Sequence, residues 1–262
     1  MKTRNLARAI AMMFLVMSVG VGAVDNSIYI DQTGENATIN ISQDGAGNRV
    51  RGIQTGAGAG NTTPAVINGD GMQIDITQVG AGNVLNLGIQ STTADGSAPT
   101  SVSYNVLGGG NTGTINLNAD NQGTNASSIV DITQTNGNNI ANINMLGSKN
   151  SLTANQSGGS AQLISTVDAN NTTQTINTSG GTDNRVTTNL TGDKGTVVVD
   201  MVGASNHATI TQDGGGTMGH YTKLDVAGSN NTYTVNQSGT IDTTVNIKTT
   251  GSGNTFGIVT KN

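Results

Sequence analysis

The sequence contains no cysteine and no tryptophan, and only two of its 262 residues are proline. The absence of cysteine excludes a disulfide framework and every metal site that is built on thiolates. Aromatic residues make up 2% of the chain, so it lacks the large apolar side chains that a thick globular core requires. Charged residues make up only 10%, with Glu35 as the sole glutamate, which is not the composition of a typical disordered chain.

The residues that are abundant belong to strands and turns. The chain contains 38 glycines together with many Asn, Thr, Ile and Val residues. β-Branched side chains favour strands, whereas Gly and Asn favour tight turns. The formal net charge is −5, so the chain has no basic surface for nucleic acid. The composition therefore predicts an all-β protein that does not bind nucleic acid.

Residues 1–23 have the organisation of a secretory signal peptide. Lys2, Arg4 and Arg8 form a basic start, an apolar run spans 9–21, and Ala23 ends a small-residue cleavage site. The apolar run is too short for a membrane-spanning helix, and no second one follows. We therefore expect a mature chain of residues 24–262 that is secreted to the extracellular space or cell surface and has no membrane span.

A short motif, Gly-x-x-Asn, recurs along the mature chain. We interpret its glycines as turn residues with positive φ. The predicted turn glycines are Gly45, Gly80, Gly108, Gly147, Gly181, Gly203, Gly228 and Gly251.

The residues after each motif alternate with a period of two. Asn231, Tyr233, Val235 and Gln237 share one parity, which places Asn, two apolar residues and Gln on one face of a strand. We predict that such amides point inward and hydrogen-bond to their counterparts in neighbouring repeats, forming a structural ladder. The predicted ladder residues are Gln32, Asn36, Gln43, Asn48, Gln54, Gln78, Asn83, Asn111, Gln134, Asn139, Asn150, Gln156, Asn184, Asn206, Gln212, Asn231, Gln237 and Asn254.

The spacing of the motif predicts how the repeats stack. The intervals between Asn184, Asn206, Asn231 and Asn254 are 22, 25 and 23 residues. We infer a β-solenoid of strand-turn-strand rungs, with roughly 22–25 residues and two strands per rung, over the single domain 24–262. Pro64 and Pro99 cannot donate to an interior ladder, so the segments near 56–71 and 91–101 are expected to be inserted loops.

The stretch Gln43-x4-Asn48-x5-Gln54 resembles the core of the curlin repeat, the repeat of bacterial curli subunits. Gln78-x4-Asn83 resembles its first half and Asn231-x5-Gln237 its second half, so the resemblance is degenerate but extends over most of the mature chain. It implies a solenoid with two strands per rung, secretion through an outer-membrane pore, and polymerisation into amyloid-like fibres of a biofilm matrix. It also implies a nucleator subunit as a partner.

The sequence offers no catalytic constellation. His207 and His220 have no spaced partners for a metal site, and many of the aspartates, such as Asp44, Asp70, Asp193 and Asp213, lie beside Gly or at strand–turn joints. The tandem nonapeptide of calcium-binding β-rolls is absent. We therefore expect no enzyme activity, no metal and no cofactor.

Two functions remain open at this point. One is a self-assembling, curli-like fibre subunit that serves surface adhesion and biofilm formation. The other is a non-polymerising adhesin or phage-associated spike that binds a ligand through its inserted loops. Residues 245–248 and 256–259 still look like ordinary repeat strands, which favours an open end that polymerises.

Overall fold

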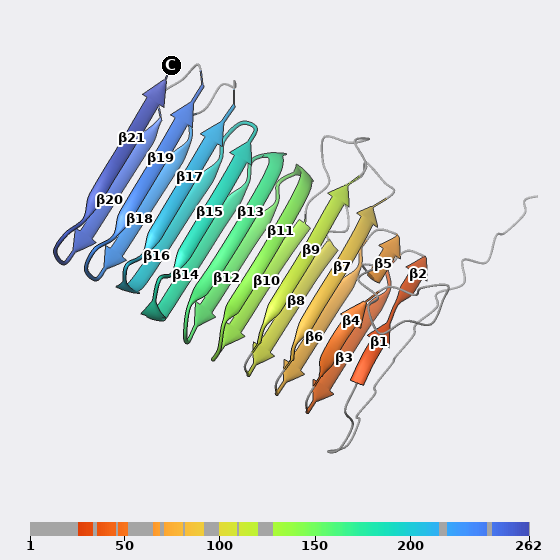
Figure 1. Cartoon of the computed structure of the whole chain (residues 1–262). Coiled ribbons are helices and arrows are strands. Elements are labelled where there is room, and N and C mark those ends of the chain that lie inside the picture. Colours follow the sequence, from red (N-terminus) through yellow and green to blue (C-terminus); the bar gives the residue numbers. More distant parts are fainter. Residues whose placement is uncertain are drawn as a thin grey trace, which may run out of the picture.

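The computed structural model describes residues 26–33, 36–45, 47–51, 65–68, 71–80, 82–91, 100–108, 110–119, 128–214, 219–239 and 243–261. The predicted signal peptide and Gln54 lie outside these residues. The described chain is a stack of strands arranged in two parallel sheets that face each other (Figure 1).

The first sheet, here called sheet A, contains β1, β2, β4 and the odd-numbered strands from β5 to β21. Its strands are β1 (Asn26–Tyr29), β2 (Asp31–Thr33), β4 (Asn48–Arg51), β5 (Ala65–Asn68), β7 (Val84–Ser91), β9 (Thr112–Ala119), β11 (Asn139–Ser148), β13 (Ala161–Asn170), β15 (Arg185–Thr191), β17 (His207–Asp213), β19 (Thr232–Ser238) and β21 (Thr255–Lys261).

The second sheet, sheet B, contains the strands that alternate with those of sheet A along the chain. They are β3 (Thr38–Asp44), β6 (Gln73–Val79), β8 (Thr100–Leu107), β10 (Ser128–Thr135), β12 (Ser151–Ser157), β14 (Thr173–Thr182), β16 (Thr196–Ala204), β18 (Tyr221–Ala227) and β20 (Thr244–Thr250).

The register between strands defines the rungs. From β10 onward each strand pairs in parallel with the strand two places further along the chain, as β12 does with β10 and β14. Ser151 lies beside Thr173, which lies beside Thr196, so these rungs have the predicted length of 22–25 residues. Such stacking of two-strand rungs is a β-solenoid, and the predicted fold class is confirmed.

The N-terminal rungs are longer than predicted because they carry the insertions. Gln43 and Gln78 are column neighbours separated by 35 residues, and Gln78 and Val106 are column neighbours separated by 28. Part of the segment expected to be a loop, Ala65–Asn68, instead forms β5, which pairs with β2 and β7. The second insertion follows Ser91, the end of β7, and its residues 92–99 lie outside the described part of the chain.

The core lies between the two sheets and is one side chain thick from each side. Along β17 every second residue is buried, and the same alternation runs through β10, β12 and β18. Because parallel strands in register place equivalent residues side by side, the core consists of columns that run along the solenoid axis. One such column includes Ile76, Tyr104, Ile132 and Ala154. In the part of the chain that is described, no helix has the length and apolarity to cross a bilayer.

Candidate functional site

The Asn residues of the Gly-x-x-Asn motif close the turns of sheet A. The side-chain nitrogen Nδ2 of Asn206 donates to the carbonyl oxygen of Gly203 at 3.0 Å. Asn231 donates in the same way to Gly228 at 2.8 Å, and Asn111 to Gly108 at 3.0 Å. The motif therefore has a physical cause: the amide satisfies the carbonyl group of the glycine that starts the turn.

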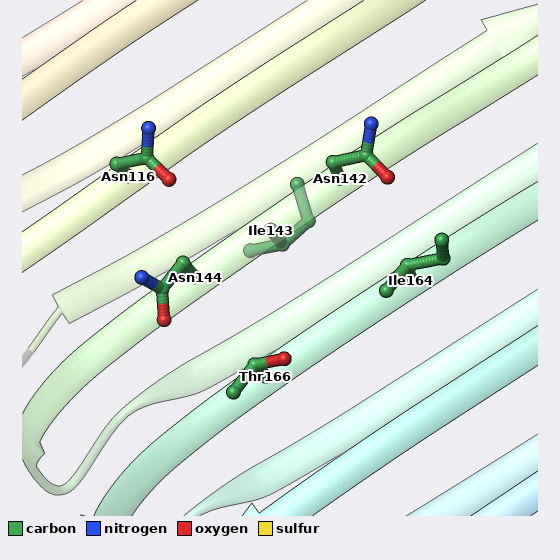
Figure 2. Close-up of a pocket in the computed structure, with 6 residues that line it drawn as sticks. All are labelled: Asn116, Asn142, Ile143, Asn144, Ile164 and Thr166. Carbon is green, nitrogen blue, oxygen red and sulfur yellow. The ribbon is translucent and has the colours of Figure 1, made fainter.

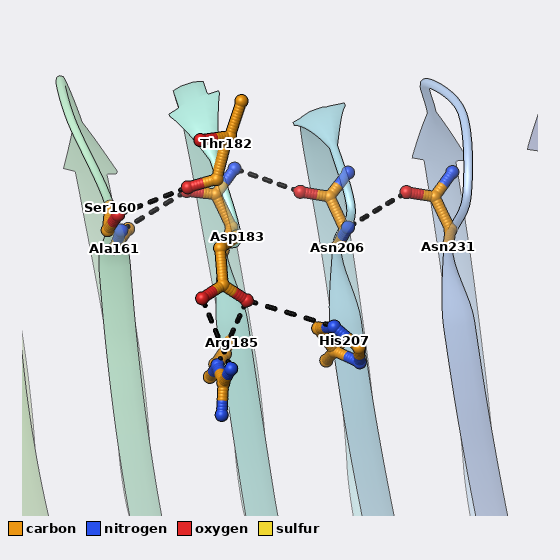
Figure 3. Close-up of polar contacts among 9 residues, drawn as sticks. Ser160, Ala161, Thr182, Asp183, Arg185, Asn206, His207 and Asn231 are labelled. Atoms are coloured by element: carbon orange, nitrogen blue, oxygen red, sulfur yellow. Dashed lines mark hydrogen bonds and ion pairs between the residues drawn. The ribbon is translucent and has the colours of Figure 1, made fainter.

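The same Asn side chains connect neighbouring rungs. Asn184 Nδ2 donates to Asn206 Oδ1 at 2.9 Å, and the backbone N–H of Asn206 donates to Asn231 Oδ1 at 3.0 Å (Figure 3). Asn231 Nδ2 donates to Asn254 Oδ1 at 2.9 Å. These contacts form an amide column along one corner of the solenoid.

This Asn column is interrupted where the repeat deviates. Asn139 lies beside Ala161, and the backbone N–H of Ala161 donates to Asn184 Oδ1 at 3.2 Å (Figure 3). Asn150 does not belong to the column, because it precedes β12 and therefore lies at sheet B. Its side chain is buried, and neither polar atom has a hydrogen-bond partner among the described residues.

The Gln residues form pairs rather than one continuous ladder. Gln78 Nε2 donates to Gln43 Oε1 at 2.7 Å, and Gln156 Nε2 donates to Gln134 Oε1 at 2.8 Å, both within sheet B. The pair in which Gln237 donates to Gln212 Oε1 at 2.6 Å lies in sheet A. Each pair satisfies one buried donor and one buried acceptor, whereas Gln156 Oε1 and Gln237 Oε1 have no partner among the described residues.

Tyr104 ends one of these Gln pairs, a role that we did not predict. In the next rung Val106 lies beside Gln78 and has no side-chain donor. The hydroxyl group of Tyr104 donates to Gln78 Oε1 at 2.8 Å in its place. Burial of Tyr104 raises the pKa of its hydroxyl group, so this group remains a neutral donor. A side chain at Gly113 would lie against the Tyr104 ring, at 2.9 Å from its Cε1, which explains the glycine within β9.

Other buried polar residues also escaped prediction. Ser165 Oγ donates to Gln174 Oε1 at 2.6 Å, and Thr222 Oγ1 donates to Gln212 Oε1 at 2.6 Å. The signal in the sequence is parity, because Gln174 is two residues before Ile176 in β14 and therefore points to the same, buried face.

Most predicted ladder residues are buried. They are Gln43, Asn48, Gln78, Asn83, Asn111, Gln134, Asn139, Asn150, Gln156, Asn184, Asn206, Gln212, Asn231 and Gln237. The prediction for Asn36 is wrong, since this residue is an exposed bend residue with φ of 56°. Gln32 and Asn254 are half-buried, because they lie in the outer rungs where no further described rung covers them.

The predicted turn glycines all have positive φ, between 64° and 147°. They are Gly45, Gly80, Gly108, Gly147, Gly181, Gly203, Gly228 and Gly251. At several of these corners the glycines also stack. A Cβ atom at Gly228 would overlap the carbonyl oxygen of Gly203, and one at Gly251 would overlap that of Gly228. Glycine is therefore required there both by the backbone conformation and by the close approach of adjacent rungs.

The C-terminal rung, formed by β20 and β21, lies at one end of the stack, and no further described rung covers it on that side (Figure 1). Phe256 is 47% exposed, whereas its column neighbour Tyr233 is 1% exposed. Ile258 is 51% exposed, whereas Val235 is fully buried. No described strand pairs with the outer edges of β20 and β21, so their backbone groups on that side form no ladder.

The two ends of the solenoid carry the same columns. The column of Ile247 runs down sheet B through Leu224 to Ile41, and that of Val245 runs through Val197 to Ile39. In sheet A the column of Phe256 ends at Ile28. Val245, Ile247 and Phe256 of the C-terminal rung therefore each have an apolar counterpart at the N-terminal end.

Among the described residues, no group of three or more His, Asp or Glu side chains could hold a metal ion. Arg185 Nε lies 3.0 Å from Asp183 Oδ1 on the surface, and His207 Nε2 lies 3.7 Å from the same oxygen (Figure 3). The hydrogen bond from Arg185 lowers the pKa of Asp183.

His220 is buried at a corner of sheet B, and its Nδ1 has no partner among the described residues. Desolvation lowers its pKa, while the negative charges of Asp193 and Asp213 partly oppose this shift. Gly195 and Gly214 lie close to its ring, since Cβ atoms placed there would be 3.2 Å from Nδ1 and 3.2 Å from Cε1, respectively.

Comparison with known proteins gives no family assignment. No protein family, no curated protein and no solved structure matches this chain.

Proposed function

We propose that this protein is a secreted, non-enzymatic structural subunit that assembles end to end into curli-like amyloid fibres for surface adhesion and biofilm formation. Its partner in assembly is a second copy of itself. The observation that carries the proposal is the match between the two ends of the solenoid, where an uncovered apolar rung faces outward at one end and the same columns end at the other.

Stacking two copies in register would continue every column. The edge of β20 would pair with β3 of the next copy, and that of β21 with β1 and β2, because these strands are the edges of the two sheets. Ile247 would then lie beside Ile41, and Phe256 beside Ile28, as their columns dictate. Unpaired strand edges favour this kind of addition, and burial of apolar surface stabilises it.

Secretion belongs to the same proposal, and its support is the organisation of residues 1–23 as a signal peptide. The resemblance to the curlin repeat supports a nucleator subunit and an outer-membrane pore as partners. The alternative of a non-polymerising adhesin or phage-associated spike depends on the inserted segments near 56–71 and 91–101. Residues 56–64, 69–70 and 92–99 of these segments lie outside the described residues.

The proposal is tested by charging the terminal rung. Ile247→Lys places an ammonium group on the open core face, whereas Asn246→Lys places the same group on the outer surface of the same strand. Purified chains of residues 24–262 are incubated from denaturant and followed by thioflavin-T fluorescence and electron microscopy. We expect unbranched, seeding-competent fibres from the unmodified chain and from Asn246→Lys, and none from Ile247→Lys.

A stable, dye-negative monomer of the unmodified chain would refute self-assembly. Equal fibre formation by both lysine variants would refute the role of the terminal rung. Circular dichroism of the soluble variants verifies that each still folds as a β protein.

A further inference from the structure

The outer surfaces of the two sheets differ in charge. The two central outward columns of sheet A, here called the neutral face, contain no charged residue among the described strands from β7 to β21. They consist of Asn86, Thr114, Asn142, Ile164, Thr187, Thr209, Thr234 and Gly257, and of Gly88, Asn116, Asn144, Thr166, Asn189, Thr211, Asn236 and Val259.

The outer surface of sheet B carries charged residues in its two central columns. Its central columns contain Asp75, Asp131, Asp200, Lys223, Asp225 and Lys248. Lys248 Nζ lies 3.5 Å from Asp225 Oδ2, so part of this charge is paired on the surface. Because the chain is acidic overall, an uncharged face that extends from β7 to β21 is a distinct chemical feature.

The neutral face is hollowed between β9 and β13. Asn116, Asn142 and Asn144 surround a shallow pocket of about 260 Å³ together with Ile164 and Thr166, above the buried Ile143 (Figure 2). Ile164 is 38% exposed and forms an apolar wall. The pocket is therefore lined by amides, a hydroxyl group and one aliphatic side chain.

The amides around this pocket are not used by the protein. No hydrogen bond joins the side chains of Asn116, Asn142 or Asn144 to any described residue, whereas on the opposite face Asn177 Nδ2 donates to Asn155 Oδ1 at 2.8 Å. Each free carboxamide offers two donors and an acceptor, the pattern that matches a sugar hydroxyl group. Neighbouring rungs repeat such groups at about 4.8 Å along the axis.

We propose that the neutral face binds an uncharged polysaccharide, with one sugar unit seated in the pocket between β9 and β13 and the chain extended along the Asn and Thr columns. The absence of charge favours a neutral glycan over an acidic one, because no cation is present to compensate a carboxylate. Face-to-face packing of two solenoids is the competing occupant, and it is separated from the glycan by the experiment.

The test is a pull-down of the full chain with microcrystalline cellulose and with chitin, using alginate beads as the acidic probe and a sample without polysaccharide as the blank. Asn142→Asp with Asn144→Asp keeps the shape of the pocket but adds two negative charges. The matched control, Thr153→Asp with Asn155→Asp, adds the same charges two residues apart on the opposite face.

We expect saturable binding to at least one neutral polysaccharide, little binding to alginate, and about tenfold weaker binding of the Asn142/Asn144 variant only. Absence of binding to both neutral polysaccharides would overturn the proposal, as would equal loss in both variants. Sedimentation in the blank that disappears in the Asn142/Asn144 variant would assign the face to packing between copies instead.

Discussion

At the scale of single residues, the interior amides impose a strict pairing requirement. Gln78 accepts a hydrogen bond from Tyr104 and donates one to Gln43, so all three side chains are satisfied together. An acceptor that loses its donor in the core costs about 1–3 kcal/mol, which exceeds the net gain from a typical hydrogen bond. The ladder is therefore stabilising only where its partners are complete.

Tyr104→Phe tests this requirement, because it removes one hydroxyl group and retains the ring beside Gly113. We expect the free energy of unfolding to fall by about 1–2 kcal/mol, measured by urea titration of the unassembled chain. The control is Tyr29→Phe, since Tyr29 is 47% exposed and should tolerate the change. Equal stability of the two variants would contradict the assignment.

His220 makes the stability of the chain depend on pH. Its folded pKa lies below the ordinary value of about 6.5 because of burial. As the pH falls through about 6.5, the unfolded chain takes up a proton that the folded chain does not, so stability is complete above this value and is lost below it. Asp193 and Asp213 reduce the size of this effect.

We expect the urea midpoint of the unassembled chain to decrease when the pH is lowered from about 7.5 to about 5.5. His220→Gln should make this decrease smaller. A profile that His220→Gln does not alter would show that another group is responsible.

At the scale of the strand and its turn, the corner glycines set how closely rungs approach. Gly228→Ala would place a methyl group against the carbonyl oxygen of Gly203 and force φ of 143° on an alanine. We expect a loss of at least about 2 kcal/mol in the free energy of unfolding. Gly257→Ala is the control, because the backbone of Gly257 is extended and a Cβ atom placed there would lie 3.9 Å from its nearest contacts, Thr234 Oγ1 and Tyr233 O. Similar midpoints for the two variants would contradict the stacked-corner account.

The alternation along each strand could be predicted from the sequence, but the sheet to which a strand belongs could not. Asn231, Tyr233, Val235 and Gln237 are all buried, as their shared parity indicated. Asn150 has the same local pattern yet lies at the other sheet, because a period of two gives the face of a strand and not its neighbour.

Longer-range features were also beyond the sequence pattern. Asn36 resembles a ladder residue but lies in an exposed bend, and Tyr104 completes the Gln78 pair from another rung. Ala65–Asn68 forms β5 within a segment that composition assigned to a loop, because pairing with β7 determines its conformation. Such contacts depend on residues that are distant in the chain.

At the scale of the whole molecule, each rung is stabilised by the rungs on either side of it. The C-terminal rung has a neighbour on one side only among the described residues, and its apolar side chains are correspondingly exposed. The columns that end there begin again at the other end of the molecule. The central claim of end-to-end assembly therefore predicts which residues meet at the junction between two copies.

The column that contains Lys248 runs through Asp225 and Asn105 to Ser42. In-register stacking would bring Lys248 of one copy beside Ser42 of the next at the parallel strand spacing of about 4.8 Å, which a disulfide can span. Asn40 lies two residues away along β3, and the added offset takes it beyond disulfide reach. The chain has no cysteine of its own, so engineered pairs have no background.

The most direct measurement is disulfide cross-linking in fibres grown from two single-cysteine chains. The account predicts a covalent dimer from Lys248→Cys mixed with Ser42→Cys. It predicts none from Lys248→Cys mixed with Asn40→Cys, and none from Lys248→Cys alone. A dimer from Lys248→Cys alone would show that like ends meet, and fibres without any cross-link would show a different junction; either result would contradict in-register, end-to-end assembly.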